Sequence, residues 1–145
     1  MKVNLAILAL FISTPLFANT TLFQCTTAND KELLVTMNSS SVSYKFGYTL
    51  TNPELSFTLP NTKVNYGVSN KPSNQYSVYS LDMPNGDTTY RIYSKYSEYS
   101  HQLDIDSGIS VIKNGKELAH IPCMNKSYYD YVDSLDSNRL SYIFY

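Results

Sequence analysis

Val42–Leu50 has the sequence VSYKFGYTL, in which a large apolar or aromatic residue occupies every second position. Successive side chains of a β-strand point to opposite faces, so this stretch would gather its large residues on one face. It therefore predicts a half-buried strand. The same period of two predicts further strands at Thr21–Thr27, Leu33–Met37 and Glu54–Leu59.

A first Asn-Gly pair, Asn114-Gly115, predicts a hairpin between Gly108–Lys113 and Lys116–Ile121, because this dipeptide favours two-residue type I′ turns. Such a turn would pair Lys113 with Lys116. Continued along the strands, the same register would place Val111 opposite Leu118 and Ile109 opposite His120.

A second pair, Asn85-Gly86, predicts a hairpin between Gln75–Pro84 and Asp87–Lys95. The same turn would place Leu81 opposite Tyr90 and Tyr79 opposite Ile92. A three-residue loop would instead place Leu81 opposite Thr89. The match of apolar faces favours the first register.

The chain after residue 123 has a different pattern. Ser127 could cap a short helix in which Tyr128, Val132 and Leu135 recur at helical spacing, and Leu140–Tyr145 is a strand that we expect to join a sheet. With about eight short strands and one short C-terminal helix, the fold class is all-β, an antiparallel β-sandwich or barrel.

The first eighteen residues have the features of a bacterial signal peptide. Lys2 precedes an apolar run that ends before Ala18, and this run is too short to span a membrane, as is every other run in the chain. Lipidation at Cys25 is disfavoured because bulky Gln24 precedes it. We therefore expect a signal peptide at 1–18 and a single β domain at 19–145, with the C-terminal helix and tail starting near 124. The expected compartment is the periplasm, with secretion or the cell surface as alternatives.

The chain has two cysteines, Cys25 and Cys123, which bracket the exported part. Cysteines in an oxidising compartment usually pair, and no C-x-x-C redox motif is present. A bond between them would close a loop of 98 residues. By lowering the entropy of the unfolded chain, such a bond stabilises the folded state by about 4–5 kcal/mol. Two free thiols are the alternative.

Charge argues against two classes of partner. Without Lys2, ten basic and twelve acidic side chains give a net charge of −2 with histidine neutral. Nucleic-acid-binding domains normally show a basic surface, and no polybasic run for membrane docking is present either.

Tyrosine is the most unusual component, with 14 residues and no tryptophan. Tyr90, Tyr93, Tyr96 and Tyr99 recur every three residues, which fits neither a one-sided strand nor an amphipathic helix. Tyrosine is enriched at protein interfaces. We therefore predict that Tyr93, Tyr96 and Tyr99 contact a partner; the alternative is an aromatic core and rim.

A second candidate surface follows Cys123. Tyr129, Asp130 and Asp133 would form an acidic aromatic surface on the expected helix, suited to a cationic toxin or wall hydrolase. The alternative is a solvated helix face.

Catalytic patterns are weak. His101, Asp104 and Asp106 come nearest to a metal or acid–base cluster, but the later acidic ligand of a calcium loop is missing. We predict no catalytic residue, no metal site and no cofactor.

Several segments together carry a resemblance: Phe23-Gln24-Cys25, Ser43–Gly47, Asn52–Leu55, the Tyr-rich hairpin Asn85–Tyr93, Gly108–Val111 with Asn114-Gly115-Lys116, and Ile121-Pro122-Cys123. Over about residues 23–123, the chain resembles small exported proteobacterial proteins with a terminal disulfide, of the periplasmic immunity or inhibitor kind. The resemblance implies protection of the cell envelope from toxins such as type VI secretion effectors, and it assigns no active-site residue.

The functional expectation is a periplasmic or secreted binding protein, monomer or homodimer, that occludes a protein partner and performs no chemistry. Two alternatives stay open. One is a structural surface or pilus-like subunit, suggested by the cysteine pair and the aromatic C-terminal strand. The other is a glycan-acting enzyme that uses Asp104 and Asp106.

Overall fold

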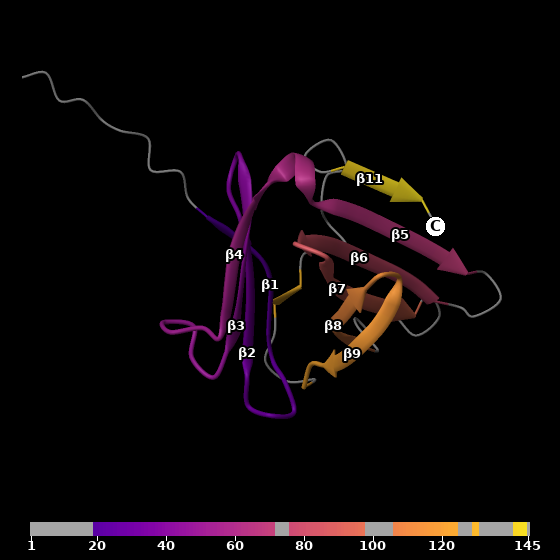
Figure 1. Ribbon diagram of the computed structural model, residues 1–145. Helices are drawn as coiled ribbons and strands as arrows, with labels where there is room; N and C mark the ends of the chain where they lie inside the picture. Colours follow the sequence, from indigo (N-terminus) through magenta and orange to yellow (C-terminus); the bar gives the residue numbers. More distant parts are fainter. Residues whose placement is uncertain (1–18, 72–75, 98–105, 125–128, 131–140, 145) are drawn as a thin grey trace, which may run out of the picture.

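The computed structural model describes residues 19–71, 76–97, 106–124, 129–130 and 141–144. Within these ranges the chain forms two β-sheets and a single turn of 3-10 helix, η1, at Asn61–Lys63 (Figure 1). The all-β prediction is therefore confirmed, and the arrangement is sandwich-like. The expected signal peptide at 1–18 lies outside the described residues. In the described part of the chain, no helix is long and apolar enough to span a membrane.

The first sheet is antiparallel and has the order β10-β1-β2-β3-β4. Its strands are β1 (Thr20–Thr26), β2 (Glu32–Met37), β3 (Ser41–Gly47), β4 (Leu55–Pro60) and β10 (Tyr129–Asp130). Strand β3 is shorter than the alternation predicted, since it ends at Gly47 and leaves Tyr48 62% exposed. A Cβ at Gly47 would lie 2.6 Å from the Glu54 nitrogen, so the returning chain crosses close to the backbone here.

The second sheet has the order β11-β5-β6-β7-β8-β9. Its strands are β5 (Asn65–Lys71), β6 (Tyr76–Asn85), β7 (Thr88–Ser97), β8 (Asp106–Lys113), β9 (Lys116–Pro122) and β11 (Ser141–Phe144). Strand β11 pairs with β5, which confirms the expectation that the C-terminal strand joins a sheet. This pair is parallel, whereas we predicted only antiparallel pairs.

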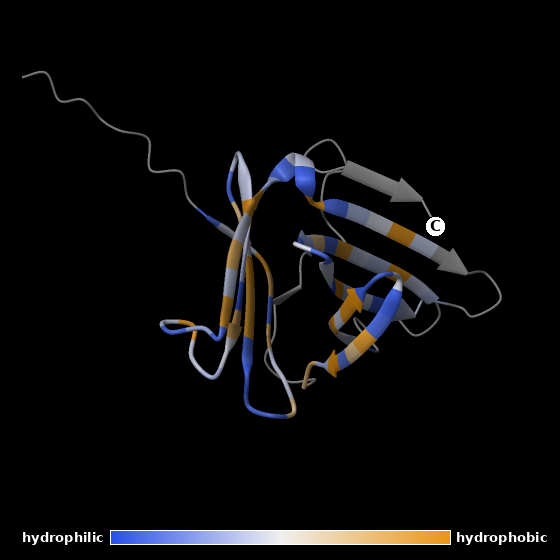
Figure 2. Cartoon of the chain, in the orientation of Figure 1, coloured by the Kyte–Doolittle hydropathy of each residue, from blue (hydrophilic) through white to orange (hydrophobic). Residues whose placement is uncertain are grey.

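One hydrophobic core lies between the sheets, built from alternate residues of nearly every strand, as the orange bands of Figure 2 show. Leu33, Val35 and Met37 of β2 are buried, and so are Leu81 and Met83 of β6, Ile92 of β7 and Ile109 of β8. The sheets also meet through aromatic rings: Tyr44 of β3 stacks on Phe57 of β4 at 4.9 Å between centroids and lies 5.4 Å from Tyr90 of β7. Tyr90 thus belongs to the core.

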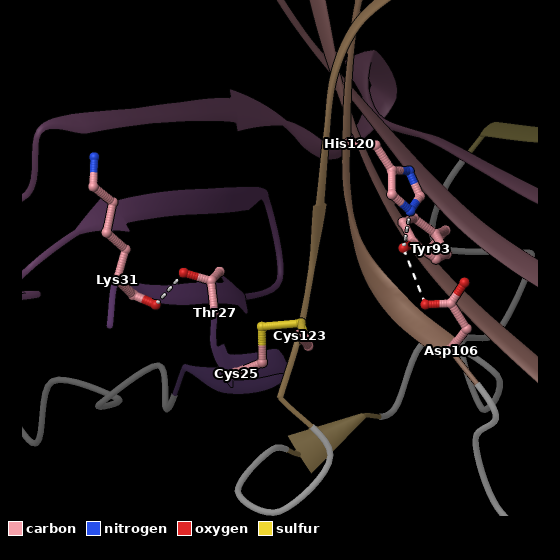
Figure 3. Close-up of a disulfide and its surroundings, with 7 residues drawn as sticks. All are labelled: Cys25, Thr27, Lys31, Tyr93, Asp106, His120 and Cys123. Atoms are coloured by element: carbon pink, nitrogen blue, oxygen red, sulfur yellow. Dashed lines mark hydrogen bonds between the residues drawn. A yellow bond between two sulfur atoms is a disulfide. The ribbon is translucent and has the colours of Figure 1, made fainter. Parts of the chain in front are cut away.

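The two sheets are joined along two sides. On one side, β4 continues through η1 into β5 (Figure 1). On the other, Cys25 of β1 forms a disulfide with Cys123, the residue after β9, as predicted (Figure 3). Across the two sheets, the Met124 nitrogen donates to the Thr26 oxygen at 2.8 Å and Thr27 forms a β-bridge with Cys123, while within the second sheet the Cys123 nitrogen donates to the Ser107 oxygen at 2.8 Å. The disulfide therefore fastens a seam that backbone hydrogen bonds already close, and it is compatible with an exported, oxidising compartment.

Two further expectations are wrong. The described chain has eleven strands rather than about eight, and the two for which no strand was predicted are β5 and the two-residue β10. The expected C-terminal helix is not found where it should begin: Tyr129 and Asp130 pair with Gln24 and Phe23 of β1. Backbone pairing with an available strand edge has replaced the weak helical pattern there. Residues 131–140 lie outside the described residues.

The Asn85-Gly86 hairpin forms with a register shifted by two residues. The turn is centred on Gly86 and Asp87, and only the first has a positive φ, +64°, as in type II′ turns. Asn85 consequently pairs with Thr88, and Leu81 lies opposite Ile92 instead of Tyr90. A shift of two keeps every residue on its face, which is why the apolar match could not detect it.

The Asn114-Gly115 hairpin forms the predicted turn, with φ of +51° and +74° and Lys113 opposite Lys116. A β-bulge then adds one residue to β9, so Val111 lies opposite Ala119 and Ile109 opposite Ile121. The predicted pairs with Leu118 and His120 are therefore wrong. Leu118 is the extra residue and is 57% exposed.

Candidate protein-interaction surface on the second sheet

The faces of the two sheets that point away from the core differ in chemistry. On the first sheet the register places a row of small hydroxyl side chains, with Thr36 beside Ser43 and Ser43 beside Thr58, next to a row in which Lys45 lies between Leu34 and Ser56. On the second sheet it gathers larger groups capable of strong interactions: Tyr76, Asp82, Arg91, Tyr93, Lys95, Asp106 and His120. We call this second surface the outer face. Tyr and Arg are over-represented in protein interfaces and their hot spots.

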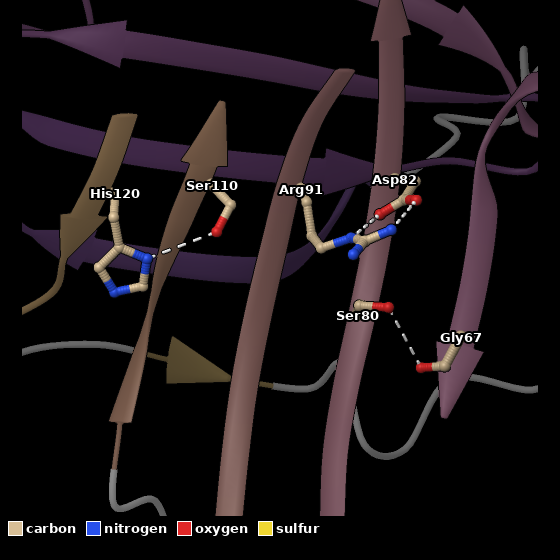
Figure 4. Close-up of polar contacts among 6 residues, drawn as sticks. All are labelled: Gly67, Ser80, Asp82, Arg91, Ser110 and His120. Carbon is tan, nitrogen blue, oxygen red and sulfur yellow. Dashed lines mark hydrogen bonds and ion pairs between the residues drawn. The ribbon is translucent and has the colours of Figure 1, made fainter. Parts of the chain in front are cut away.

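Four residues of the outer face lie in one register across four strands. His120 of β9 is opposite Ser110 of β8, which is opposite Arg91 of β7, which is opposite Asp82 of β6 (Figure 4). We call this set the polar row. It crosses the sheet at right angles to its strands, so neighbouring side chains lie within contact distance.

At the end of the polar row formed by β6 and β7, the side chains make an ion pair. Arg91 donates from Nε to Asp82 Oδ1 at 2.6 Å and from a terminal nitrogen to Asp82 Oδ2 at 2.7 Å (Figure 4). This two-bond geometry fixes the guanidinium plane. The Asp82 side chain is 12% exposed and that of Arg91 is 32% exposed, so the pair is partly withdrawn from water and presents its cationic side.

The other end of the row is an anchored imidazole. His120 Nε2 lies 2.8 Å from the Tyr93 hydroxyl, and the two rings stack at 5.1 Å between centroids. The same hydroxyl donates to Asp106 Oδ1 at 3.2 Å (Figure 3). Tyr93 reaches His120 across Gly108, its register partner, where a Cβ would lie 2.3 Å from the Ile121 backbone oxygen and 3.0 Å from the Tyr93 oxygen. Glycine is therefore required at this crossing.

Hydrogen-bond counting assigns the imidazole tautomer. A carboxylate only accepts, so the single Tyr93 proton goes to Asp106, and His120 must donate its Nε2 proton to the Tyr93 oxygen. Nδ1 then carries the lone pair of the neutral ring. It lies 3.5 Å from both the Ser110 hydroxyl and a Glu117 carboxylate oxygen. Neutral His120 can accept from Ser110, and protonated His120 can donate to Glu117.

Exposure is concentrated at the β9 end of the outer face. The side chains of His120 and Glu117 are 47% and 50% exposed, whereas Tyr93 and Ser110 are only 7% and 6% exposed as whole residues. The buried groups therefore hold the exposed ones in position. The described residues contain no group of three His, Cys, Asp or Glu side chains that could hold a metal ion.

The predicted partner-binding residues are distributed differently from our expectation. Tyr93 lies on the outer face beneath His120, but Tyr96 points to the other side of β7 and packs edge-on against Tyr79 at 5.4 Å. Tyr129 and Asp130 form β10. Tyr99 and Asp133 lie outside the described residues, as do His101 and Asp104. Asp106, considered for metal or acid–base chemistry, accepts the Tyr93 hydrogen bond.

Sequence reasoning missed the polar row. Asp82 and Arg91 would have been recognised as a pair had the hairpin register been right, because the predicted register placed Asp82 opposite Thr89. His120 was missed because the bulge at Leu118 moves it opposite Ser110.

Comparison with known proteins gives no match: no family model, no curated protein and no solved structure is significantly similar to this chain.

Proposed function

We propose that this chain is an exported binding protein that occludes a protein partner, and that the partner docks on the outer face of the second sheet. The observation that carries the proposal is the polar row, in which Arg91 and His120 are held by neighbouring side chains before any partner arrives. Groups that are already ordered lose little conformational freedom on binding, which favours affinity.

The contrast between the two sheets supports the choice of face. Serine and threonine side chains of the first sheet hydrogen-bond to one another, as between Ser43 and Thr58 at 2.8 Å. The outer face instead offers an aromatic hydroxyl, an imidazole and cations, including Lys95, whose Nζ lies 4.2 Å from the Tyr76 ring centroid. Among these groups, tyrosine and arginine are enriched in binding hot spots, and a cation held over an aromatic ring gains when a partner desolvates it.

The proposed compartment rests on the leader and the disulfide, and the proposed partner class rests on the resemblance to exported immunity proteins. A leader of signal-peptide type and a disulfide-fastened β domain suit the bacterial periplasm. The partner class we propose is an envelope-targeting toxin, including a cell-wall hydrolase, with this protein acting as its immunity protein or inhibitor.

The test compares matched variants of two lysines. Lys95→Glu alters the outer face, whereas Lys45→Glu makes the same charge change on the opposite side of the molecule, on β3. His120→Ala is the third single variant. Each variant is mixed with toxins encoded beside the gene for this chain, and binding is measured by calorimetry. We expect Lys95→Glu and His120→Ala each to weaken binding by about tenfold, as loss of one contact worth about 1.4 kcal/mol would.

Two results would contradict the proposal. One is loss of binding with Lys45→Glu and not with Lys95→Glu, which would place the partner on the first sheet. The other is turnover of a wall substrate by the purified chain, which would make it an enzyme. Circular dichroism of each variant shows whether it is folded.

A further inference from the structure

Strand β9 ends the second sheet, and one of its backbone edges has no strand beside it among the described residues. Lys116, Glu117, Leu118, Ala119 and His120 are all exposed. The open stretch stops at Cys123, where Thr27 of the first sheet forms a bridge. Unpaired edges of this kind are templates for pairing with another strand.

The shape of this edge restricts what can pair with it. The bulge at Leu118 interrupts the regular spacing of backbone groups, and Pro122 ends the strand without an N–H. A regular strand laid along β9 would lose register at the bulge. A second copy of β9 in antiparallel orientation brings the same irregularity to the same place, because the two-fold axis passes through it.

The sequence of the edge is complementary to itself. If the axis lies between Leu118 and Ala119, antiparallel pairing places Glu117 opposite His120 of the other copy twice and Leu118 opposite Ala119 twice. Glu117 and His120 both belong to the outer face, since their partners on β8 are Ile112 and Ser110. The bulge is what allows residues three apart to share that face. Opposite-charge pairs, which Glu117 and His120 form when the imidazole is protonated, and apolar cross-strand pairs stabilise a sheet.

From this complementarity we infer that the protein forms a two-fold homodimer by antiparallel pairing of β9 with β9 of a second copy. The dimer would join two second sheets into one and two outer faces into one continuous surface. Pairing limited to Lys116–Ile121 buries far less than a standard interface, so the dimer is weak and forms with increasing concentration. The inference concerns the chain alone and holds or fails independently of the proposed partner.

The experiment is sedimentation of the purified mature chain over a concentration series, with charge-swap variants. Glu117→His places two imidazoles opposite each other, and His120→Glu places two carboxylates opposite each other. Each single variant should weaken dimerisation by about tenfold, since both symmetry-related copies of the Glu117–His120 pair are lost. The double variant Glu117→His/His120→Glu restores the opposite pairs and should restore the dimer. Lys45→Glu, on β3, is the control without effect.

Three outcomes would overturn the inference. The first is a wild-type chain that stays monomeric up to about 1 mM, and the second is a double variant as weak as the singles. The third is a monomer whose β9 variants lose binding to a partner toxin, which would assign the edge to an extended segment of that partner. Reversal in the double variant also excludes misfolding as the cause of the single-variant effects.

Discussion

Removal of the disulfide should be the most destabilising change that leaves the native contacts almost intact. The bond closes a loop of 98 residues, and Cys25 and Cys123 are 1% and 8% exposed. Chain-entropy arithmetic for a loop of this length gives about 4.7 kcal/mol at 25 °C, lost through a wider denatured ensemble. The Met124–Thr26 backbone hydrogen bond and the Thr27–Cys123 bridge remain to hold the seam. Single domains are stable by only about 5–15 kcal/mol, so the reduced protein should be folded but marginal.

The assay is urea unfolding of three samples: the oxidised protein, the same protein fully reduced, and Cys25→Ala/Cys123→Ala. We expect both altered samples to lose about 4–5 kcal/mol in the free energy of unfolding and to show a larger m-value, because their unfolded chains expose more surface. The difference between the reduced sample and the double variant isolates the burial of the two sulfur atoms. A loss below about 1 kcal/mol with an unchanged m-value would refute the reasoning, since the bond would then be constraining a denatured state that is already compact.

Three further predictions concern the outer face and the core. Gly108→Ala should lower the free energy of unfolding by about 1–3 kcal/mol, because the new Cβ would press on the Ile121 oxygen and on Tyr93. The comparison is Gly115→Ala, which has open space around it but a φ of +74°, and which should lower that free energy by about 1 kcal/mol in thermal unfolding. Arg91→Met should lower the free energy of unfolding by about 1.5–3 kcal/mol, because it removes two charged hydrogen bonds from buried Asp82. The double variant Arg91→Met/Asp82→Asn should recover part of that loss. Equal stability of the single and the double variant would argue against the ion pair. Burial raises the pKa of Tyr44, so its neutral phenol stabilises the fold below the ordinary tyrosine pKa of about 10, and this stability is lost as the pH rises further. Between pH 10 and 11, the free energy of unfolding of Tyr44→Phe should therefore fall by roughly 1 kcal/mol less than that of the wild type. Parallel plots of unfolding free energy against pH for the two proteins would contradict the assignment.

The fold class was predictable because a strand that is buried on one face has apolar residues at every second position. Leu33, Val35 and Met37 show it, and each is buried in β2. The cysteine pair was predictable because the leader indicates an oxidising compartment. Strand β5 was not predicted, although Tyr66 and Val68 alternate with Gly67 and Ser69. The alternation is short, and the edge partner of β5, strand β11, comes from a distant segment.

The polar row was out of reach for a more specific reason. A sequence pattern reports the face of each residue, but register depends on turn geometry and bulges. The turn at Gly86 and Asp87 shifts one hairpin by two residues, and the bulge at Leu118 shifts the other by one. Arg91 meets Asp82 only because of the first shift, and His120 meets Ser110 only because of the second. The tyrosine run was misleading, because its period of three sends Tyr93 to the outer face and Tyr96 to the inner one.

The bond between Cys25 and Cys123 also decides how this chain responds to mechanical force. A pull on its two ends extends only the segments before residue 25 and after residue 123, because the covalent link carries the load past everything between them. Roughly 330 Å of contour length, from 98 residues at about 3.4 Å each, is thereby withheld from extension. Strands β10 and β11 and the Thr20–Gln24 part of β1 lie outside the link, so they would peel from their neighbours while the remainder stays folded. Under oxidising conditions, a motor that threads proteins through a pore would stall at this disulfide unless the pore is wide enough for two chains side by side.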